Sequence, residues 1–264
     1  MSFIRTVWTY YREHGRRFAW REQITPYRVL VSEVMLQQTQ TSRITERFPR
    51  FLQRFPTLSD LAAASLSEVL GEWQGLGYNR RGKYLHEAAR LLETNFAGTV
   101  PADSQELRTL PGIGAYTSAS IPCFAYNVPT IFIETNIRTV YLHHFFPEAQ
   151  AVSDKDILPL IERDVDSANA REWYYALMDY GAYLKAAYPS RNTQSRHYRR
   201  QSKFEGSNRQ VRANILKQVL LAPQTLTQLR AAFPATETRL EANLQALLQE
   251  GLLARREGLY RIGE

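Results

Sequence analysis

The chain has 264 residues, 44% of them hydrophobic, and a formal charge of +7. This length suits one large domain, or one domain with a small appendage, and the hydrophobic content supports a real core. The sequence lacks a run of about 18 apolar residues, which excludes a membrane-spanning helix. The single cysteine, Cys123, excludes an internal disulfide and a multi-cysteine metal or iron–sulfur site. The basic balance favours a polyanion such as nucleic acid, although many basic proteins have other partners.

The N-terminal region predicts a helix with a clear start. Thr25 can cap it, Pro26 suits the first helical position, and the apolar run 27–36 continues it. The residues before it lack the apolar segment of a secretion signal, so we expect a cytoplasmic protein.

Further helices follow, and strand patterns are scarce in the first two-thirds of the chain. Residues 56–76 predict two helices, with Ser59 and Ser65 as candidate caps. Residues 80–98 predict an amphipathic helix that stops at Gly98. Its expected buried face carries Leu85, Ala88, Ala89 and Leu92.

The character of the sequence changes near residue 189. Residues 189–207 are polar and basic, which predicts a surface linker. Residues 208–264 show three short helical patterns and an alternating stretch around Gly258, an order that resembles a winged helix. A protein-docking or dimerisation module is the alternative. We therefore divide the chain into a helical domain (1–188), a basic linker (189–207) and a winged-helix-like domain (208–264).

The stretch "VSEVMLQQTQ", residues 31–40, places the carboxylate of Glu33 in an apolar run. Burying a charge is costly unless the charge is paired or used. This placement therefore marks Glu33 as a candidate functional acid.

The stretch "LPGIG", residues 110–114, lies between two helical runs. Gly112 and Gly114 permit a tight turn and a close approach of another backbone. The next helix then begins with unpaired N–H groups, which bind phosphate. The pattern predicts a helix-hairpin-helix that grips the DNA backbone; an ordinary helical turn with glycine caps is the alternative.

The stretch "IFIETNIRTV", residues 131–140, embeds a second carboxylate, Glu134, after an apolar run. By itself, this glutamate fits a solvent-facing helix start, where the helix dipole favours an acid. Two embedded carboxylates on either side of a phosphate-binding hairpin favour a shared catalytic role instead.

In order along residues 3–185, "FAWREQITPYRVLVSEVMLQQTQ", "GEWQGLGYNRRGKYLHEAA", "LPGIGAYTSASI" and "ETNIRTV" resemble the MutY branch of the helix-hairpin-helix DNA glycosylases. The resemblance implies an all-α fold of two helical subdomains with a cleft between them, joined here to the small winged-helix-like domain. Members of the family flip a base into the cleft and hydrolyse its N-glycosidic bond.

The resemblance implies a catalytic role for four residues. Glu33 matches the general acid that protonates the adenine ring, a task suited to a carboxyl whose pKa an apolar pocket raises. Glu134 matches the second carboxylate, and Asn136 the asparagine beside it. Tyr116 stands where bifunctional relatives such as endonuclease III carry a Schiff-base lysine, so we expect a monofunctional hydrolase without lyase activity.

The resemblance also implies DNA contacts. Gln38 matches the wedge that fills the gap left by the flipped base, and Tyr78 the intercalating tyrosine opposite. Gly112 and Gly114 match the phosphate-gripping hairpin, and Arg80 is a further candidate DNA contact.

Three further residues match the pocket of the family. Trp20 and Arg21 resemble part of the pocket lip. Asp179 falls where the family usually has a glutamate that supports the pocket.

The chain departs from the family pattern in three ways. Glu134 replaces the usual aspartate, and its extra methylene moves the carboxylate by more than an ångström, which can cost about 10²-fold in rate. The four-cysteine iron–sulfur loop is missing, so we expect no cluster; the linker that replaces it keeps arginines such as Arg199 that can contact phosphates. We expect no other cofactor, although a monovalent cation at the hairpin stays open. The MutT-like C-terminal domain of the family is absent.

The favoured function is therefore base excision repair by an adenine DNA glycosylase that acts opposite 8-oxoguanine or guanine. Hypoxanthine, or thymine or uracil in mismatches, are alternative targets, and a catalytically silent DNA-binding protein is a third hypothesis. The expected partner is double-stranded DNA with a mispaired or damaged base. We expect a monomer in the bacterial cytoplasm, on the nucleoid when bound to DNA, with no membrane partner.

Overall fold

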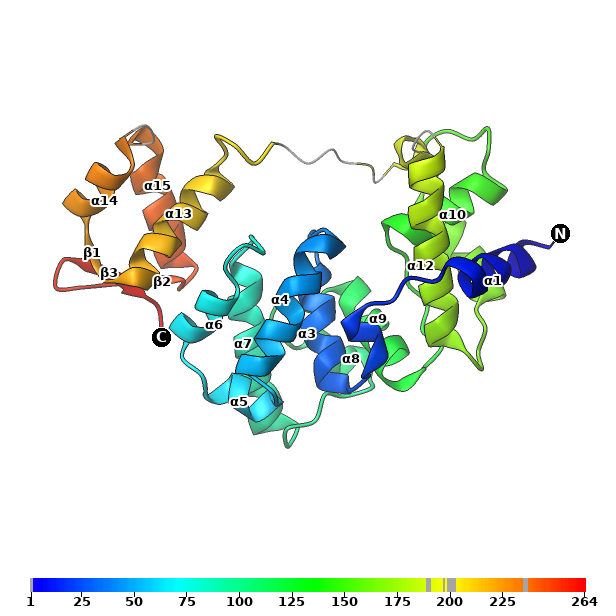
Figure 1. Cartoon of the computed structure of the whole chain (residues 1–264), viewed down its shortest axis with the longest axis horizontal. Coiled ribbons are helices and arrows are strands. Elements are labelled where there is room, and N and C mark those ends of the chain that lie inside the picture. Colours follow the sequence, from blue (N-terminus) through cyan, green and yellow to red (C-terminus); the bar gives the residue numbers. More distant parts are fainter. Residues whose placement is uncertain (1, 189–190, 197, 199–202, 235–236) are drawn as a thin grey trace. The chain divides into compact units, whose positions relative to one another are not determined.

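A computed structural model describes residues 2–188, 191–196, 198, 203–234 and 237–264 (Figure 1). Helices dominate this part of the chain, as the sequence predicts, and the chain packs into two compact units. Unit 1 contains Met1–Glu33, Val100–Thr109 and Ile113–Arg200; unit 2 contains Val34–Thr99, Leu110–Gly112 and Gln201–Glu264. The division into domains 1–188 and 208–264 stays a prediction.

Unit 1 is built around one long helix, α12. The helices α1 and α10 pack against it (Figure 1), and the contact with α10 is close. A Cβ added at Gly181 of α12 would lie 2.2 Å from the backbone oxygen of Asn136, so only glycine fits there. The elements of unit 1 are α1 (Phe3–His14), α2 (Ala19–Glu22), most of α3 (Pro26–Leu36), α8 (Ser104–Arg108), α9 (Ala115–Tyr126), α10 (Thr135–Phe145), α11 (Asp154–Asp164), α12 (Ala170–Ala187) and the 3₁₀ helix η1 (Arg191–Gln194).

The start of α3 confirms the local prediction. The helix begins at Pro26, and the Thr25 hydroxyl accepts a hydrogen bond from the Arg28 N–H at 3.2 Å. The helix continues to Leu36, so Glu33 lies in its penultimate turn. The local start signals Thr25 and Pro26 therefore set the helix on which Glu33 lies.

Unit 2 begins with four helices: α4 (Thr41–Arg54), α5 (Leu58–Ala63), α6 (Leu66–Glu72) and α7 (Arg80–Asn95). Ser65 caps α6, as predicted, but Ser59 does not cap α5. Thr57 does so, because it and Asp60 bond each other's backbone N–H groups in a capping box. Ser59 lies inside the helix and its hydroxyl bonds Glu93 at 2.7 Å.

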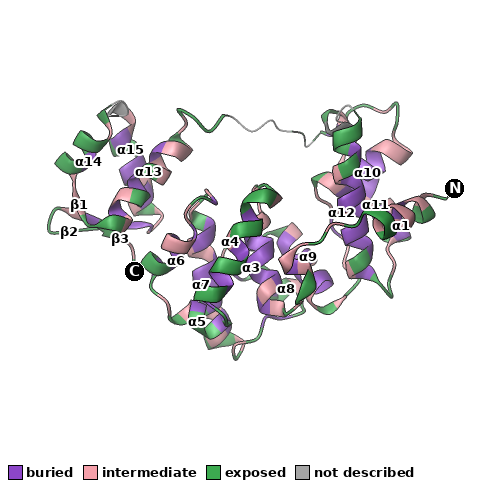
Figure 2. Ribbon diagram, in the orientation of Figure 1, coloured by how far each residue is buried: buried purple, intermediate pink, exposed green. Residues whose placement is uncertain are grey.

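The predicted amphipathic helix is α7, and its expected face is buried (Figure 2). Gly98 follows it with a φ of 72°, and its N–H bonds the carbonyl of Leu92 at 3.0 Å. Glycine is favoured at such a left-handed helix end because it has no Cβ. The predicted stop signal is therefore confirmed.

The end of the chain forms the winged-helix-like part of unit 2. Its elements are α13 (Asn208–Leu221), β1 (Gln224–Thr225), α14 (Leu226–Ala232), α15 (Glu237–Gln249), β2 (Leu253–Arg256) and β3 (Leu259–Ile262). The strands form an antiparallel sheet in the order β1-β3-β2. Leu66 and Leu70 of α6 belong to the same apolar cluster as this region, so the cluster joins α6 to the C-terminal helices.

Among the described residues, no helix has both the length and the apolar surface that crossing a membrane requires.

Candidate functional site

Glu33 is a buried acid, as its apolar neighbours in the sequence predict. It is 5% exposed and lies in unit 1, on α3. The hydroxyl of Ser120 on α9 donates a hydrogen bond to one carboxylate oxygen, and the Tyr116 hydroxyl bonds the same carboxyl group. Burial raises the pKa of Glu33 to about 7, against the lowering effect of these two hydrogen bonds. Glu33 therefore keeps its proton to a higher pH than an ordinary glutamate.

Glu134 is half-buried at the N-terminus of α10, also in unit 1. One carboxylate oxygen accepts from the backbone N–H groups of Asn136 at 2.7 Å and Ile137 at 2.8 Å. The other accepts from the Asn136 side-chain amide at 3.2 Å. Glu134 therefore caps the helix, as the alternative interpretation expects, but it does so from a partly enclosed position.

Burial also raises the pKa of Glu134, although the two backbone N–H groups and the nearby Lys185 and Arg138 oppose that effect. The charge of Glu134 in turn contributes to the raised pKa of Glu33. The two predicted carboxylates therefore lie close enough to influence each other, across about 100 residues of sequence.

Tyr116 completes this group. Its pKa lies well above the usual range because of burial and because Glu33 and Glu134 surround it with negative charge. The phenol therefore stays neutral and donates hydrogen bonds rather than attacking as a nucleophile. Asn136, the fourth predicted catalytic residue, orients Glu134 and accepts from the Lys185 ammonium at 3.4 Å.

Asp179 forms a buried ion cluster with two arginines of unit 1. It is 1% exposed and accepts from Arg21 through both guanidinium Nη atoms, at 3.0 and 3.1 Å. It also accepts from Arg16, through the backbone N–H at 2.7 Å and through Nε at 2.9 Å. Removing Asp179 would leave the buried guanidinium of Arg21 without this carboxylate, which is strongly destabilising.

The predicted pocket residues Trp20 and Arg21 are fixed by the same cluster. The Trp20 ring stacks on Phe18, with centroids 4.5 Å apart. The Arg21 guanidinium lies 5.1 Å from the Phe18 centroid and 4.2 Å from that of Tyr175. Asp179 therefore holds Arg21, whose guanidinium packs on the same Phe18 ring as Trp20. The supporting role that the resemblance assigns to Asp179 stays a prediction.

In unit 2, Gln38 and Tyr78 both adopt the left-handed backbone conformation, with φ of 53° and 47°. This conformation is uncommon for non-glycine residues and often marks functional positions. Tyr78 is 36% exposed although its ring is large. The two predicted wedge residues therefore occupy special turns in the loops that follow α3 and precede α7.

Arg81 holds these two loops together, although it was not among the residues predicted from the sequence. Its guanidinium donates to the carbonyls of Val34, Met35, Leu76 and Gly77, at 2.8 to 3.3 Å, and to the Thr39 hydroxyl at 2.9 Å. Burial lowers its pKa to about 10. The position was detectable, because Arg81 falls on the helical stripe of Leu85, Ala88 and Leu92, where a charge is out of place.

The predicted hairpin joins α8 to α9. Gly112 has a φ of 75°, and a Cβ there would lie 2.9 Å from that of Tyr84, so both backbone angle and space favour glycine. Its carbonyl accepts from the Gln37 side chain at 3.2 Å. Gly114 is the N-cap of α9, and no side chain caps this helix. The first turn of α9 therefore has no side-chain cap at Gly114, and phosphate binding by its N–H groups stays a prediction.

Two predicted DNA contacts remain. Arg80 is exposed; its guanidinium bonds the Tyr84 hydroxyl and lies 3.8 Å from Glu250. Arg199 lies outside the described residues. Within the described ranges, no cluster of three or more His, Cys, Asp or Glu is arranged to hold a metal ion.

Comparisons with known proteins identify relatives of this chain. The family model of the HhH-GPD superfamily of base excision DNA repair proteins matches residues 31–161. An adenine DNA glycosylase of Mycobacterium tuberculosis is 33% identical over 274 residues, which cover 93% of this chain and 88% of the relative. A match of that extent reaches well beyond residue 189.

Two more distant relatives are also glycosylases. A thymine/uracil-DNA glycosylase of Methanothermobacter thermautotrophicus is 26% identical over 187 residues, covering 70% of this chain and 85% of the relative. The solved structure of a thermostable thymine-DNA glycosylase superposes with a TM-score of 0.62 at 24% identity, covering 71% of this chain and 88% of that one. This second likeness concerns the fold.

Proposed function

Because the chain belongs to the HhH-GPD superfamily of base excision DNA repair proteins, we propose that it is an adenine DNA glycosylase acting opposite 8-oxoguanine or guanine. The similarity to the mycobacterial adenine DNA glycosylase supports adenine as the target. Its partner is double-stranded DNA with a mispaired base, on which it acts as a monomer in the cytoplasm. It works without an iron–sulfur cluster, since its sequence holds one cysteine.

One observation carries this proposal: the carboxyl group of Glu33 is buried, which raises its pKa to about 7, and a second carboxylate, Glu134, lies close enough to affect it. Glu33 gives its proton to a ring nitrogen of the flipped adenine. The bond between C1′ and the base then breaks, and its electron pair leaves with the base. The sugar becomes an oxocarbenium ion, which the negative charge of Glu134 stabilises, much as paired carboxylates act in glycoside hydrolysis.

Water completes the hydrolysis. It adds to C1′ and gives a proton to the carboxylate of Glu134, which leaves an abasic site. Asn136 keeps the carboxylate in place through its amide. The capping bonds use mainly one oxygen of Glu134, so the other keeps a lone pair for the sugar or the water.

The reaction stops at the abasic site. Cleavage of the strand by β-elimination needs an amine that forms a Schiff base with the sugar. Tyr116 offers a neutral hydroxyl at the position that the family resemblance assigns to this amine. We therefore propose a monofunctional glycosylase.

A glycosylase for mispaired thymine or uracil is the second candidate. The similarity to the Methanothermobacter thymine/uracil-DNA glycosylase favours it, at lower identity. Both candidates use a flipped base and a nearby acid, so the target base distinguishes them.

The test uses the purified full-length chain and a panel of duplexes with adenine, hypoxanthine, thymine or uracil opposite each partner base. Mass spectrometry identifies the released base, and Glu33→Gln is the inactive control. Release of adenine opposite 8-oxoguanine or guanine supports the proposal, and release of thymine or uracil alone supports the second candidate. Release of nothing contradicts both. Strand cleavage that needs hot alkali after base release supports the monofunctional assignment; cleavage without alkali contradicts it.

A further inference from the structure

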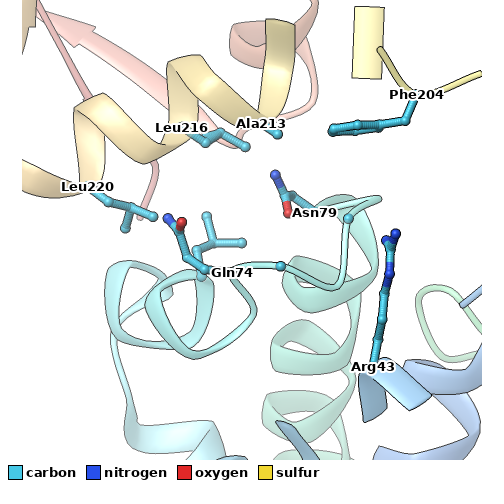
Figure 3. Close-up of a pocket in the computed structure, with 10 residues that line it drawn as sticks. Arg43, Gln74, Asn79, Phe204, Ala213, Leu216 and Leu220 are labelled. Carbon is cyan, nitrogen blue, oxygen red and sulfur yellow. The ribbon is translucent and has the colours of Figure 1, made fainter. Parts of the chain in front are cut away.

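Lys185 is a polar neighbour of the Glu134 site that the proposed mechanism does not use. It lies in the last turn of α12, and its ammonium donates a hydrogen bond to the side-chain oxygen of Asn136 at 3.4 Å. Glu134, Asn136 and Lys185 all belong to unit 1, whereas the pocket in Figure 3 is lined by residues of unit 2. Lys185 therefore belongs with the proposed catalytic residues and not with that pocket.

The packing of α12 on α10 brings Lys185 to this position. Gly181 lies so close to the backbone of Asn136 that an added Cβ would be 2.2 Å from its oxygen. Lys185 follows Gly181 by four residues, so both lie on the same face of the helix. The close contact at Gly181 therefore places the lysine side chain, one turn further along, beside the start of α10.

The side-chain amide of Asn136 is bonded at both ends, and this fixes its orientation. Its oxygen accepts from Lys185, and its nitrogen donates to one carboxylate oxygen of Glu134 at 3.2 Å. An ammonium group only donates hydrogen bonds, so the amide oxygen must face the lysine and the amide nitrogen must face the carboxylate. The opposite orientation would set oxygen against carboxylate and nitrogen against ammonium.

This orientation matters for the carboxylate oxygen that the proposed mechanism uses. The other oxygen of Glu134 is held by the backbone N–H groups of Asn136 and Ile137, at 2.7 and 2.8 Å. The oxygen that faces the sugar or the water receives the Asn136 amide. An amide that turned away would leave the carboxylate held through its capping oxygen alone.

Lys185 also brings a positive charge that no carboxylate of the described residues offsets through an ion pair. The other cation near Glu134 is Arg138, whose guanidinium binds both oxygens of Asp154 at 2.7 and 2.8 Å. The charge of Arg138 is therefore largely balanced. Lys185 acts on Glu134 with its whole charge, although its exposure to water weakens the effect.

The charge of Glu134 depends on all the groups around it. Burial raises its pKa, whereas its backbone hydrogen bonds, the charge of Lys185 and that of Arg138 lower it. Glu33 and Tyr116 are the titratable groups of α3 and α9 that interact with it. Lys185 therefore favours the ionised form of Glu134, the form that the proposed mechanism needs.

We infer that Lys185 is a positioning residue for base release, which acts through the Asn136 amide to hold the carboxylate of Glu134 where charge develops on the sugar. It does not touch the reacting atoms itself. This inference rests on the proposed glycosylase function and extends it, because it adds a residue of α12 to the group that supports catalysis.

The experiment compares full-length variants in single-turnover base release, on the duplex that the wild-type chain cleaves fastest. Lys185→Met removes the charge and the donor but keeps the length of the side chain, and Lys185→Arg keeps charge and donor. Lys155→Met is the matched control, since Lys155 is an exposed lysine on α11 of the same unit. Rates are measured between pH 5 and 9, and again in an Asn136→Ala background.

Two further measurements accompany the rates. Dissociation constants over a range of salt concentrations are measured on the same duplex with a hydrolysis-resistant 2′-fluoro target nucleotide. The ¹³C signal of the Glu134 carboxyl, identified by its absence in Glu134→Gln, gives the pKa of that group without substrate. Equal unfolding temperatures show that the variants are folded.

Lys185→Met is expected to release the base about tenfold more slowly, because one oxygen of Glu134 stays capped and the misplacement is partial. The acid limb of its rate against pH and the carboxyl titration should both move to higher pH, since Glu134 loses a neighbouring positive charge. The alkaline limb, which Glu33 sets, should stay in place. Lys185→Arg should recover most of the rate and both limbs.

The double variant tests whether Lys185 acts through Asn136. Lys185→Met should slow Asn136→Ala little further, because residues that share one network are not additive. The affinity and salt slope of Lys185→Met should match those of wild type, and Lys155→Met should match wild type in every measurement.

Three outcomes overturn the inference. If Lys185→Met equals Lys155→Met in rate and in both limbs, Lys185 does not position the carboxylate. If it slows the reaction by the same factor with and without Asn136, it does not act through that amide. If it leaves the rate unchanged, weakens binding and lowers the salt slope by about one unit, Lys185 contacts a phosphate instead.

Failure of the proposed function looks different. The wild-type chain would then release no base from any duplex of the panel. The carboxyl titration needs no substrate, so it would still show whether Lys185 acts on Glu134.

Discussion

The hydroxyl of Ser120 donates a hydrogen bond to the carboxylate of Glu33, which lies 87 residues earlier in the chain. Both side chains are buried, so water does not compete for this bond. The bond stabilises the ionised form of Glu33 and lowers its pKa, against the larger effect of burial. Ser120 therefore sets the pH range in which Glu33 can supply a proton.

Replacement of Ser120 by alanine is expected to raise the pKa of Glu33 further, because it removes a hydrogen bond to the charged form. The alkaline limb of the rate against pH should move to higher pH. Single-turnover rates of base release between pH 5 and 9 measure it. Ser118→Ala is the control, since Ser118 is equally buried on α9 but bonds the carbonyl of Ala115. An alkaline limb that stays in place would remove Ser120 from the control of Glu33.

The raised pKa of Glu33 makes the free energy of unfolding depend on pH. Its pKa rises from an ordinary value of 4.5 to about 7 on folding, so the folded protein holds this proton more tightly. The contribution to stability is fully present below pH 4.5 and is lost as the pH rises through 7. Glu33→Gln, which cannot ionise, should escape this loss and be more stable than wild type at pH 8, by up to about 3 kcal/mol. Urea unfolding at pH 5 and pH 8 tests it; a stability difference between variant and wild type that is equal at both pH values contradicts it.

Two substitutions of Glu134 separate its capping role from its proposed catalytic role. Glu134→Gln keeps a side-chain oxygen for the backbone N–H groups but removes the negative charge. It should retain most of the stability and lose roughly 10²-fold or more in base release, the scale of losing one electrostatic stabiliser. Glu134→Ala should lose the same activity and about 1 kcal/mol of stability in addition. Ser153→Ala, which removes the cap of α11, is the control for capping alone. Full activity in Glu134→Gln would reduce Glu134 to a helix cap.

Local rules account for the features that the sequence predicted well. The start of α3 depends on Thr25 and Pro26, which are neighbours, and the buried face of α7 depends on a repeat within one helix. The expectation for Ser59 was wrong because two hydroxyl residues compete for the same helix start. Thr57 prevails because Asp60 reciprocates its hydrogen bond.

Prediction of the candidate site needed more than local sequence patterns, because its residues come from distant parts of the chain. The embedded positions of Glu33 and Glu134 on either side of the predicted hairpin favoured a shared catalytic role, and the family resemblance gave each residue its part. Ser120 and Arg16 were not found, because their partners lie 87 and 163 residues away and such pairs leave no local pattern. Arg81 is different, because a charged residue on the apolar stripe of α7 is a local pattern that marks it in the sequence.

The guanidinium of Arg81 is expected to be needed both for stability and for DNA binding. Its five hydrogen bonds join the segment 34–39, which contains Gln38, to residues 76–77, which precede Tyr78. Lysine keeps the charge but cannot reach these acceptors with its single ammonium, so Arg81→Lys leaves buried carbonyls unpaired. We expect a loss of about 2–4 kcal/mol in stability and at least tenfold weaker binding to a mispair, with the salt slope unchanged. Arg90→Lys, on the exposed side of α7, is the control. Unchanged binding by a folded Arg81→Lys would mean that the wedge residues do not need the two loops to be joined.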